Sequence, residues 1–156
     1  ADAGLAKIAV VERHLATGRM GLGFVTGSGL SSGALASSVA HDAHNLVVVG
    51  MTDDDMAFAV THLADIGGGI VAVEDGRILA ECPLPVAGLL SDAPLAEVIA
   101  QSSATNEAAG SLGWTGATPF LTLAFLALSV IPSLKITDRG LVDVDRFEIV
   151  PLVVHG

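Results

Sequence analysis

The chain has little positive charge and only one cysteine, and both shortages exclude classes of function. Seven lysine and arginine residues stand against 17 aspartate and glutamate residues, for a formal net charge of −10. Nucleic-acid binders need a basic face to neutralise phosphates, so we expect no nucleic-acid partner. Cys82 alone cannot form an internal disulfide, which suits a reducing compartment and predicts a cytoplasmic protein. The apolar run around Cys82 indicates a buried residue rather than a catalytic thiol.

The sequence also lacks an apolar run long enough to span a membrane. The longest run, residues 120–131, contains Thr122 and Ser129 and is followed by Pro132. A membrane helix needs about 20 apolar residues, so we expect a buried helix and no membrane partner. We see no basic-then-apolar start typical of a signal peptide. Because the chain begins at Ala1 in a strand-like run, we expect it to be a piece of a longer polypeptide.

Apolar residues are abundant in a chain of this size. Hydrophobic residues make up 51% of the chain and charged residues 15%, and the mean hydropathy is +0.67. A length of 156 residues fits one domain with its own core, so we predict residues 1–156 to be a single domain. The charged residues are too few to cover its surface. We therefore expect part of the surface to pack against another domain or subunit, and we expect a homo-oligomer.

The spacing of apolar residues and turn formers predicts an α+β fold with mixed β-sheets and about three helices. Short apolar runs separated by Gly, Ser and Asn predict strands over residues 7–11, 21–26, 34–40 and 45–50. A helix capped by Thr52, with Asp55 in the capping-box position, is expected to end at the glycines 67–69. The dipeptide Asp75-Gly76 between residues 70–74 and 77–82 predicts a β-hairpin.

The second half of the chain predicts two further helices and a closing strand. Ser91 or Asp92 opens the first helix, with Pro94 in its first turn, and this helix reaches Leu112. Thr118 or Pro119 opens the second, very apolar helix, which ends before Pro132. Residues 138–140 form a turn, and residues 147–154 close the chain as a strand.

The densest chemical signal is the segment His41-Asp42-Ala43-His44-Asn45, which follows Ser37 and Ser38. If the segment stays extended, Asp42 and His44 share a face, and the carboxylate orients the imidazole as a general base. If the chain turns after Ala40, His41 and His44 converge as ligands or donors. The alternative is a polar strand end whose side chains hydrogen-bond nearby loops.

Other polar groups carry weaker signals. His14, His62 and His155 are scattered, and we do not expect them to be metal ligands. The glycine pairs 21/23 and 27/29 complete no dinucleotide or P-loop motif. The acidic run 53–55 is explained by a helix N-terminus. Three carboxylates near the end are expected to be solvated turn residues: Asp138, Asp143 and Asp145.

Taken together, the motifs resemble the C-terminal domain of bacterial adenine deaminase, a family of the amidohydrolase superfamily. The resemblance begins with Val10-Val11-Glu12-Arg13-His14 and continues through Gly33-Ala34-Leu35-Ala36-Ser37-Ser38-Val39-Ala40-His41-Asp42. Further matching blocks, in order, are residues 18–19, 23–25, 44–50, 55–56, 67–69, 84–92, 119–128, 131–132 and 137–144. Ser28 stands where the family has an aromatic residue and Ala43 where it has Ser, and residues 94–112 are the least similar part.

The resemblance implies a reaction in which adenine and water give hypoxanthine and ammonia, in purine salvage or catabolism. The family uses a divalent metal centre, manganese or iron, in a β/α barrel, where the metal turns water into a nucleophile. A barrel needs about 200 residues or more, and this chain has no His-x-His strand motif. We therefore expect the barrel to be absent, no metal in this chain, and no deamination by this chain alone.

Three hypotheses follow for the chain. In the first, it completes the active site of a deaminase: His41, Asp42 and His44 are the catalytic candidates. In this hypothesis Ser38 and Asn45 contact the adenine substrate or support the residues around it. In the second, the domain is structural and buries its apolar surface against the barrel domain or another subunit. In the third, it is a free-standing module that binds a small ligand.

Overall fold

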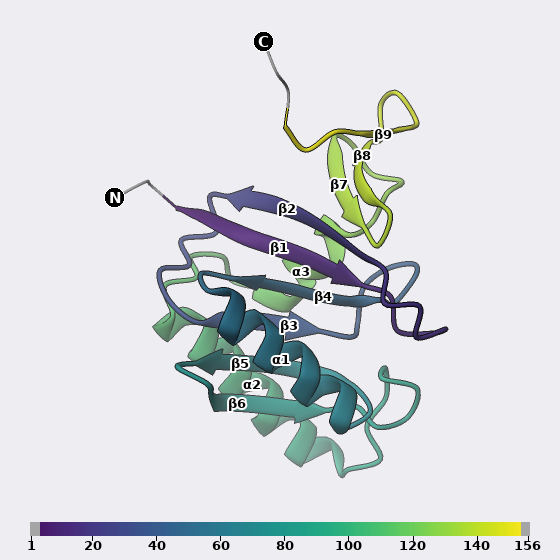
Figure 1. Cartoon of the computed structure of the whole chain (residues 1–156). Helices are drawn as coiled ribbons and strands as arrows, with labels where there is room; N and C mark the ends of the chain where they lie inside the picture. Colours follow the sequence, from purple (N-terminus) through teal and green to yellow (C-terminus); the bar gives the residue numbers. More distant parts are fainter. Residues whose placement is uncertain (1–3, 154–156) are drawn as a thin grey trace.

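The computed structural model describes residues 4–153, and its centre is a six-stranded sheet with the order β2-β1-β4-β3-β5-β6 (Figure 1). All pairings between these strands are antiparallel. The strands are β1 (Leu5–Val11), β2 (Met20–Thr26), β3 (Ala34–Ser37), β4 (Leu46–Gly50), β5 (Gly69–Glu74) and β6 (Arg77–Pro83). The central strands β3 and β4 are buried along their whole length, which explains their nearly continuous apolar sequence.

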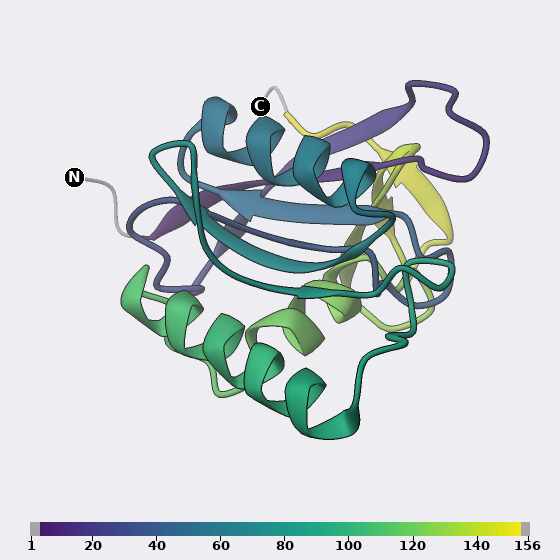
Figure 2. The ribbon, with the colours of Figure 1, turned by 90° about the horizontal axis from the view of Figure 1, so that it is seen from below.

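Helices lie on both faces of this sheet (Figure 2). Helix α1 (Asp53–Asp65) packs on one face, and α2 (Leu95–Ser111) and α3 (Pro119–Leu126) pack on the other. Successive residues of β4 alternate between the two cores: Val47 and Val49 face α2 and α3, whereas Val48 faces α1. No helix in the described part of the chain is long and apolar enough to cross a membrane.

A second, three-stranded antiparallel sheet packs beside β1 and β2 (Figure 1). It consists of β7 (Leu134–Thr137), β8 (Gly140–Asp143) and β9 (Glu148–Val150). Two glycines of β2 allow this close approach. A Cβ on Gly21 would lie 1.9 Å from the carbonyl oxygen of Thr137, and one on Gly23 would touch Ile136. The small sheet thereby brings the turn between β7 and β8 to the end of the large sheet.

The α+β class and the three helices are confirmed. So are two local signals. Thr52 caps α1: its hydroxyl accepts the Asp55 backbone N–H at 3.2 Å and donates to the Asp55 carboxylate at 3.0 Å. Residues 53–55 therefore form a helix N-terminus, as expected. Asp75 and Gly76 both have positive φ, as a two-residue hairpin turn between β5 and β6 requires.

Several predicted boundaries were wrong. The strand predicted over residues 34–40 ends at Ser37, because the Ser37 hydroxyl accepts the Val39 N–H and the next residue turns away. Helix α2 begins at Leu95 and not at residue 91 or 92. Pro94 is its extended N-cap, and the Ser91 hydroxyl binds the Ala93 N–H outside the helix.

The very apolar third helix is shorter than predicted. It ends at Leu126, and the residues up to Pro132 form turns in which Leu128 is still buried. Among these residues only Leu128 is buried, whereas Val130 and Ile131 are 68% and 44% exposed, so the apolar run marked neither the end of the helix nor burial along its whole length. The closing strand is also shorter, Glu148–Val150, and the last residue of the predicted range, 154, lies outside the described residues.

Candidate functional site

The segment from His41 to Asn45 forms a tight turn between β3 and β4 at one end of the large sheet. The turn closes with a hydrogen bond from the His44 backbone N–H to the Ala40 carbonyl at 2.6 Å, and His44 has a positive φ of 50°. The chain therefore turns after Ala40, so the extended alternative is wrong, and the roles of His41 and His44 as ligands or donors stay a prediction. The imidazoles of His41 and His44 lie side by side, with ring centroids 5.7 Å apart and planes tilted by 49°.

His44 is the better fixed of the two histidines. Its Nδ1 accepts the Ala40 backbone N–H at 3.3 Å, which places the ring proton on Nε2. Partial burial lowers the pKa of His44 below its ordinary value of 6.5, and the nearby His41 and Arg13 lower it further. His44 is therefore a neutral imidazole at neutral pH, with Nε2–H as a donor.

The side chains that follow β1 hold this turn from outside. Arg13 donates from Nε to the His44 carbonyl and from Nη2 to the Ala87 carbonyl, the latter at 2.7 Å. His14 donates from Nε2 to the Ala43 carbonyl at 2.6 Å. The residues carrying these contacts come directly after a strand paired with β4, so the sheet register places them beside the turn. Arg13 and His14 thus position the backbone of the candidate site, although their roles were not predicted.

The loop that carries His14 is itself organised by one carboxylate. Glu12 accepts backbone N–H groups from His14 at 2.6 Å, Leu15 at 2.8 Å and Thr17 at 3.1 Å, and also the Thr17 hydroxyl. These hydrogen bonds to the ionised form lower the pKa of Glu12 from 4.5 to about 2. Glu12 is therefore an anionic structural anchor for the loop.

Asn45 connects the turn to the small sheet. Its side-chain amide donates to the Asp138 carboxylate at 3.3 Å, and the other oxygen of Asp138 pairs with Arg19 Nε at 3.0 Å. The side chain of Asp138 is only 14% exposed, so the prediction of a solvated turn carboxylate was wrong for this residue. The side-chain amide oxygen of Asn45, Oδ1, is buried and has no hydrogen-bond partner within the described residues.

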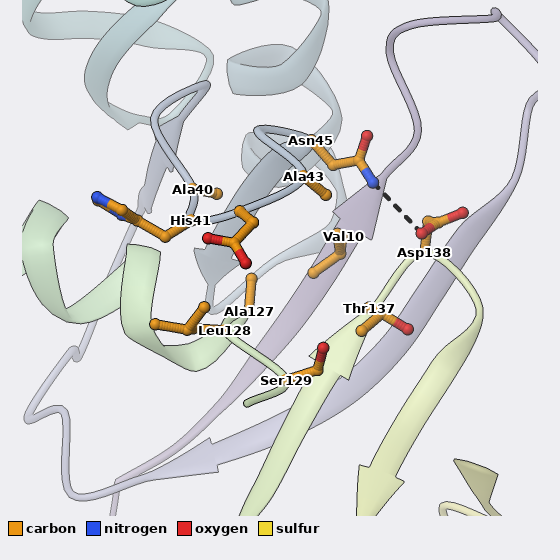
Figure 3. A pocket seen from close by; sticks show the side chains of 11 residues that line it. Val10, Ala40, His41, Ala43, Asn45, Ala127, Leu128, Ser129, Thr137 and Asp138 are labelled. Atoms are coloured by element: carbon orange, nitrogen blue, oxygen red, sulfur yellow. Dashed lines mark hydrogen bonds between the residues drawn. The ribbon is translucent and has the colours of Figure 1, made fainter. Parts of the chain in front are cut away.

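A small pocket of about 140 Å³ lies between the turn, the end of α3 and the start of the β7–β8 turn (Figure 3). Its polar lining is His41, Asp42, Asn45, Ser129, Thr137 and Asp138. In Figure 3 the amide of Asn45 points toward Asp138, whereas the imidazole of His41 points away from both. His41 instead stacks on Phe125, with ring centroids 6.2 Å apart. The pocket is small beside ligand sites of roughly 300–1,000 Å³.

Ser38 lies apart from this pocket. It is fully buried, and its hydroxyl donates to the Gly88 carbonyl at 2.6 Å and accepts the Gly69 N–H at 2.8 Å. These bonds tie the end of β3 to the start of β5 and to the loop around residue 88. A contact of Ser38 with substrate stays a prediction, and its hydroxyl is occupied by the backbone.

The metal centre implied by the family resemblance does not fit the residues of this site. Residues 4–153 contain no group of three or more His, Cys, Asp or Glu side chains arranged to hold a metal ion. At the turn, the Nδ1 of His44 is already occupied by a backbone N–H. The turn can therefore donate and accept hydrogen bonds, but it offers no set of metal ligands.

Comparison with known proteins gives one family and close relatives. The family model described as "Adenine deaminase C-terminal domain" matches residues 1–148. A protein named adenine deaminase from Oleidesulfovibrio alaskensis is 58% identical over 148 residues, which are 95% of this chain and 26% of that protein. Proteins of the same name from Desulfatibacillum aliphaticivorans (58% over 146 residues) and Moorella thermoacetica (55% over 152 residues) cover 94% and 97% of this chain. The chain spans about a quarter of the length of these relatives, 26% of each.

Proposed function

The chain belongs to the adenine deaminase C-terminal domain family, and we propose that it serves as the domain of an adenine deaminase that closes one side of the active site. The reaction of the complete enzyme is the hydrolysis of adenine to hypoxanthine and ammonia, a step of purine metabolism. The enzyme acts in the cytoplasm. The metal that activates water, Mn²⁺ or Fe²⁺, is held by a β/α barrel elsewhere in the longer polypeptide.

The observation that carries this proposal is a polar turn that is rigid at its base and open at its tip. Hydrogen bonds fix the turn to two other segments: Arg13 and His14 after β1 donate to its carbonyl groups, and its Asn45 donates to Asp138. His41 and Asp42 at the tip are exposed. If the turn only connected two strands, it would not need polar side chains exposed at its tip and several hydrogen bonds that hold its base. A pre-organised polar turn is what a site shared with another domain requires.

The chemistry available at this turn is proton handling and orientation. The neutral imidazole of His44 donates from Nε2, and Asp42 at the tip accepts hydrogen bonds. Facing a metal-bearing site, these groups would orient a water molecule or hold a proton as ammonia departs. The metal, when bound, would supply the nucleophilic water, and residues 4–153 offer no set of ligands for it.

A structural role is the second candidate, and the apolar surface favours it. Twenty large apolar side chains are exposed in the described part of the chain. Packing against the barrel or in a homo-oligomer would cover some of them. The two roles are compatible, because a domain that closes a site must also be docked.

The proposal is tested by turnover of adenine in the complete polypeptide. His41→Ala and His44→Ala should each lower kcat at least tenfold while the metal content stays unchanged. His62→Ala is the matched control, because His62 of α1 pairs with Glu81 of β6, away from the turn. Unchanged kcat in both turn variants, with unchanged metal content, would leave only the structural role.

A further inference from the structure

The two faces of the large sheet are not equally covered. On one face α2 packs on β5 and β6, α3 packs on β3 and β4, and the small sheet packs on β1 and β2. On the other face α1 packs on β3, β4 and β5. Among the described elements, none lies on the α1 side of β1 and β2. Figure 2 shows α1 on this side of the sheet and α2 and α3 on the other.

The uncovered part of this face is apolar. Met20, Leu22 and Phe24 alternate along β2 with small or half-buried residues, and they are 55%, 57% and 55% exposed. In the antiparallel register they lie opposite Val11, Ala9 and Lys7 of β1, on the side of α1. An edge strand of seven residues with three half-exposed large side chains is a surface that a free domain ordinarily avoids.

A groove of about 440 Å³ runs between this strand and α1. Its walls are apolar side chains of β1, β2 and β4 on one side and Met56, Ala57 and Val60 of α1 on the other. The exposed residues of α1 along it, Ala57 and Thr61, are small. A helix can therefore approach α1 closely while its apolar side chains rest on Leu22 and Met20.

We propose that an amphipathic helix from the rest of the deaminase polypeptide occupies this groove, beside α1. This inference rests on the proposed function, since the occupant belongs to the longer enzyme. The relatives carry about three quarters of their length outside the matched region, because this chain covers 26% of each. The groove and the pocket of the candidate site lie at the same end of the sheet but on opposite faces, since Val11 lines the groove and Val10 lines the pocket. Val11 pairs both with Met20 at the end of the groove and with Leu46, the first residue after Asn45.

Charge favours this occupant over a second copy of the chain. The carboxylate of Asp53 lines the groove and pairs with Lys7 at 2.8 Å, Asp54 and Asp65 are exposed on the same helix, and each chain carries a net charge of −10. Two copies meeting at this face would bring two such sets together. A helix with an apolar stripe bordered by Lys or Arg would match both the groove and its rim.

The experiment measures the oxidation of methionine in the complete, metal-loaded polypeptide with dilute peroxide and peptide mass spectrometry. Met56 is 7% exposed and is buried by this domain itself, so it is an internal reference for a covered methionine. If the groove is occupied, Met20 reacts as slowly as Met56. Reaction of Met20 at least tenfold faster than Met56 overturns the proposal. So does protection that disappears on dilution to the monomer, because a second copy is then the occupant.

A matched pair of variants tests the same contact. Leu22→Asp should increase the oxidation rate of Met20 at least tenfold, whereas Ile149→Asp should not. Ile149 is 59% exposed on the small sheet, as exposed as Leu22 but away from the groove. An equal response to both variants contradicts docking at the groove. The proposed function fails separately, if the unmodified polypeptide does not deaminate adenine.

Discussion

The side-chain amide of Asn45 donates to the carboxylate of Asp138 across 93 residues of sequence, at 3.3 Å. This bond joins the turn of the candidate site to the small sheet. Arg19 completes the arrangement from the start of β2, with its Nε 3.0 Å from the other carboxylate oxygen. Three segments far apart in the chain thus meet at one partly buried carboxylate.

Replacing Asp138 by Ala should therefore destabilise the protein. The substitution leaves the amide of Asn45, which is 5% exposed, and the Arg19 guanidinium without their partner. The expected loss in free energy of unfolding is about 1–3 kcal/mol, measured by urea denaturation. Asp145→Ala is the control, because Asp145 is exposed in the following turn. Equal stability of the two variants would show that the Asp138 carboxylate does not hold the turn and the small sheet together.

Glu12 should make the stability of the folded chain depend on pH in the acidic range. Its pKa is about 2 in the folded chain against 4.5 ordinarily, so the unfolded chain binds the proton more readily. The stabilisation is fully present above pH 4.5 and is lost as the pH falls toward 2. Glu12→Gln should flatten this part of the unfolding profile. Glu107→Gln, at an exposed position on α2, should keep the slope of the parent chain; equal slopes in all three proteins would contradict the assignment.

His44 should titrate below its ordinary pKa of 6.5, because burial and the neighbouring His41 and Arg13 disfavour its cation. Between the folded and the unfolded pKa the unfolded chain binds more protons. The contribution of His44 to stability is therefore lost as the pH falls below 6.5. The imidazole resonances followed by NMR over pH give the midpoint directly. A midpoint at or above 6.5 would mean that the ring is solvated and not fixed at the turn.

Gly21 should not tolerate a side chain. A Cβ would lie 1.9 Å from the Thr137 carbonyl oxygen and 2.9 Å from the Gly140 nitrogen, both of them backbone atoms. Gly21→Ala should therefore push the small sheet from β2 and lower the thermal unfolding midpoint by several degrees or more. Gly110→Ala is the control, because that glycine in α2 has open space around it. If both variants melt alike, the close approach at Gly21 is not required.

Local chemistry made part of this fold predictable from the sequence. The cap at Thr52 and the hairpin turn at Asp75-Gly76 depend on neighbouring residues alone, and both were predicted. The role of Asp138 was missed because its partners are 93 residues or more away, and no local pattern records them. The end of α3 was missed because the apolar run continues past Leu126 into a turn, where Val130 and Ile131 are exposed, and its sequence reads like that of a helix.

The candidate site, like the fold, could be predicted only in part from the sequence. The residue types of the segment from His41 to Asn45 marked it as a candidate site. Its geometry depends on Arg13 and His14, which bind carbonyl groups of the turn about 30 residues away in the sequence. Sequence reasoning left the extended and turned forms open because the sheet register decides between them.

The most direct measurement is an experimental structure of the complete polypeptide with its metal bound. His41 and Asp42, exposed in this domain, should then lie buried beneath the metal-bearing domain, with the turn facing the substrate cavity. A structure in which both side chains remain in bulk solvent, with the turn directed away from the metal, would contradict the account.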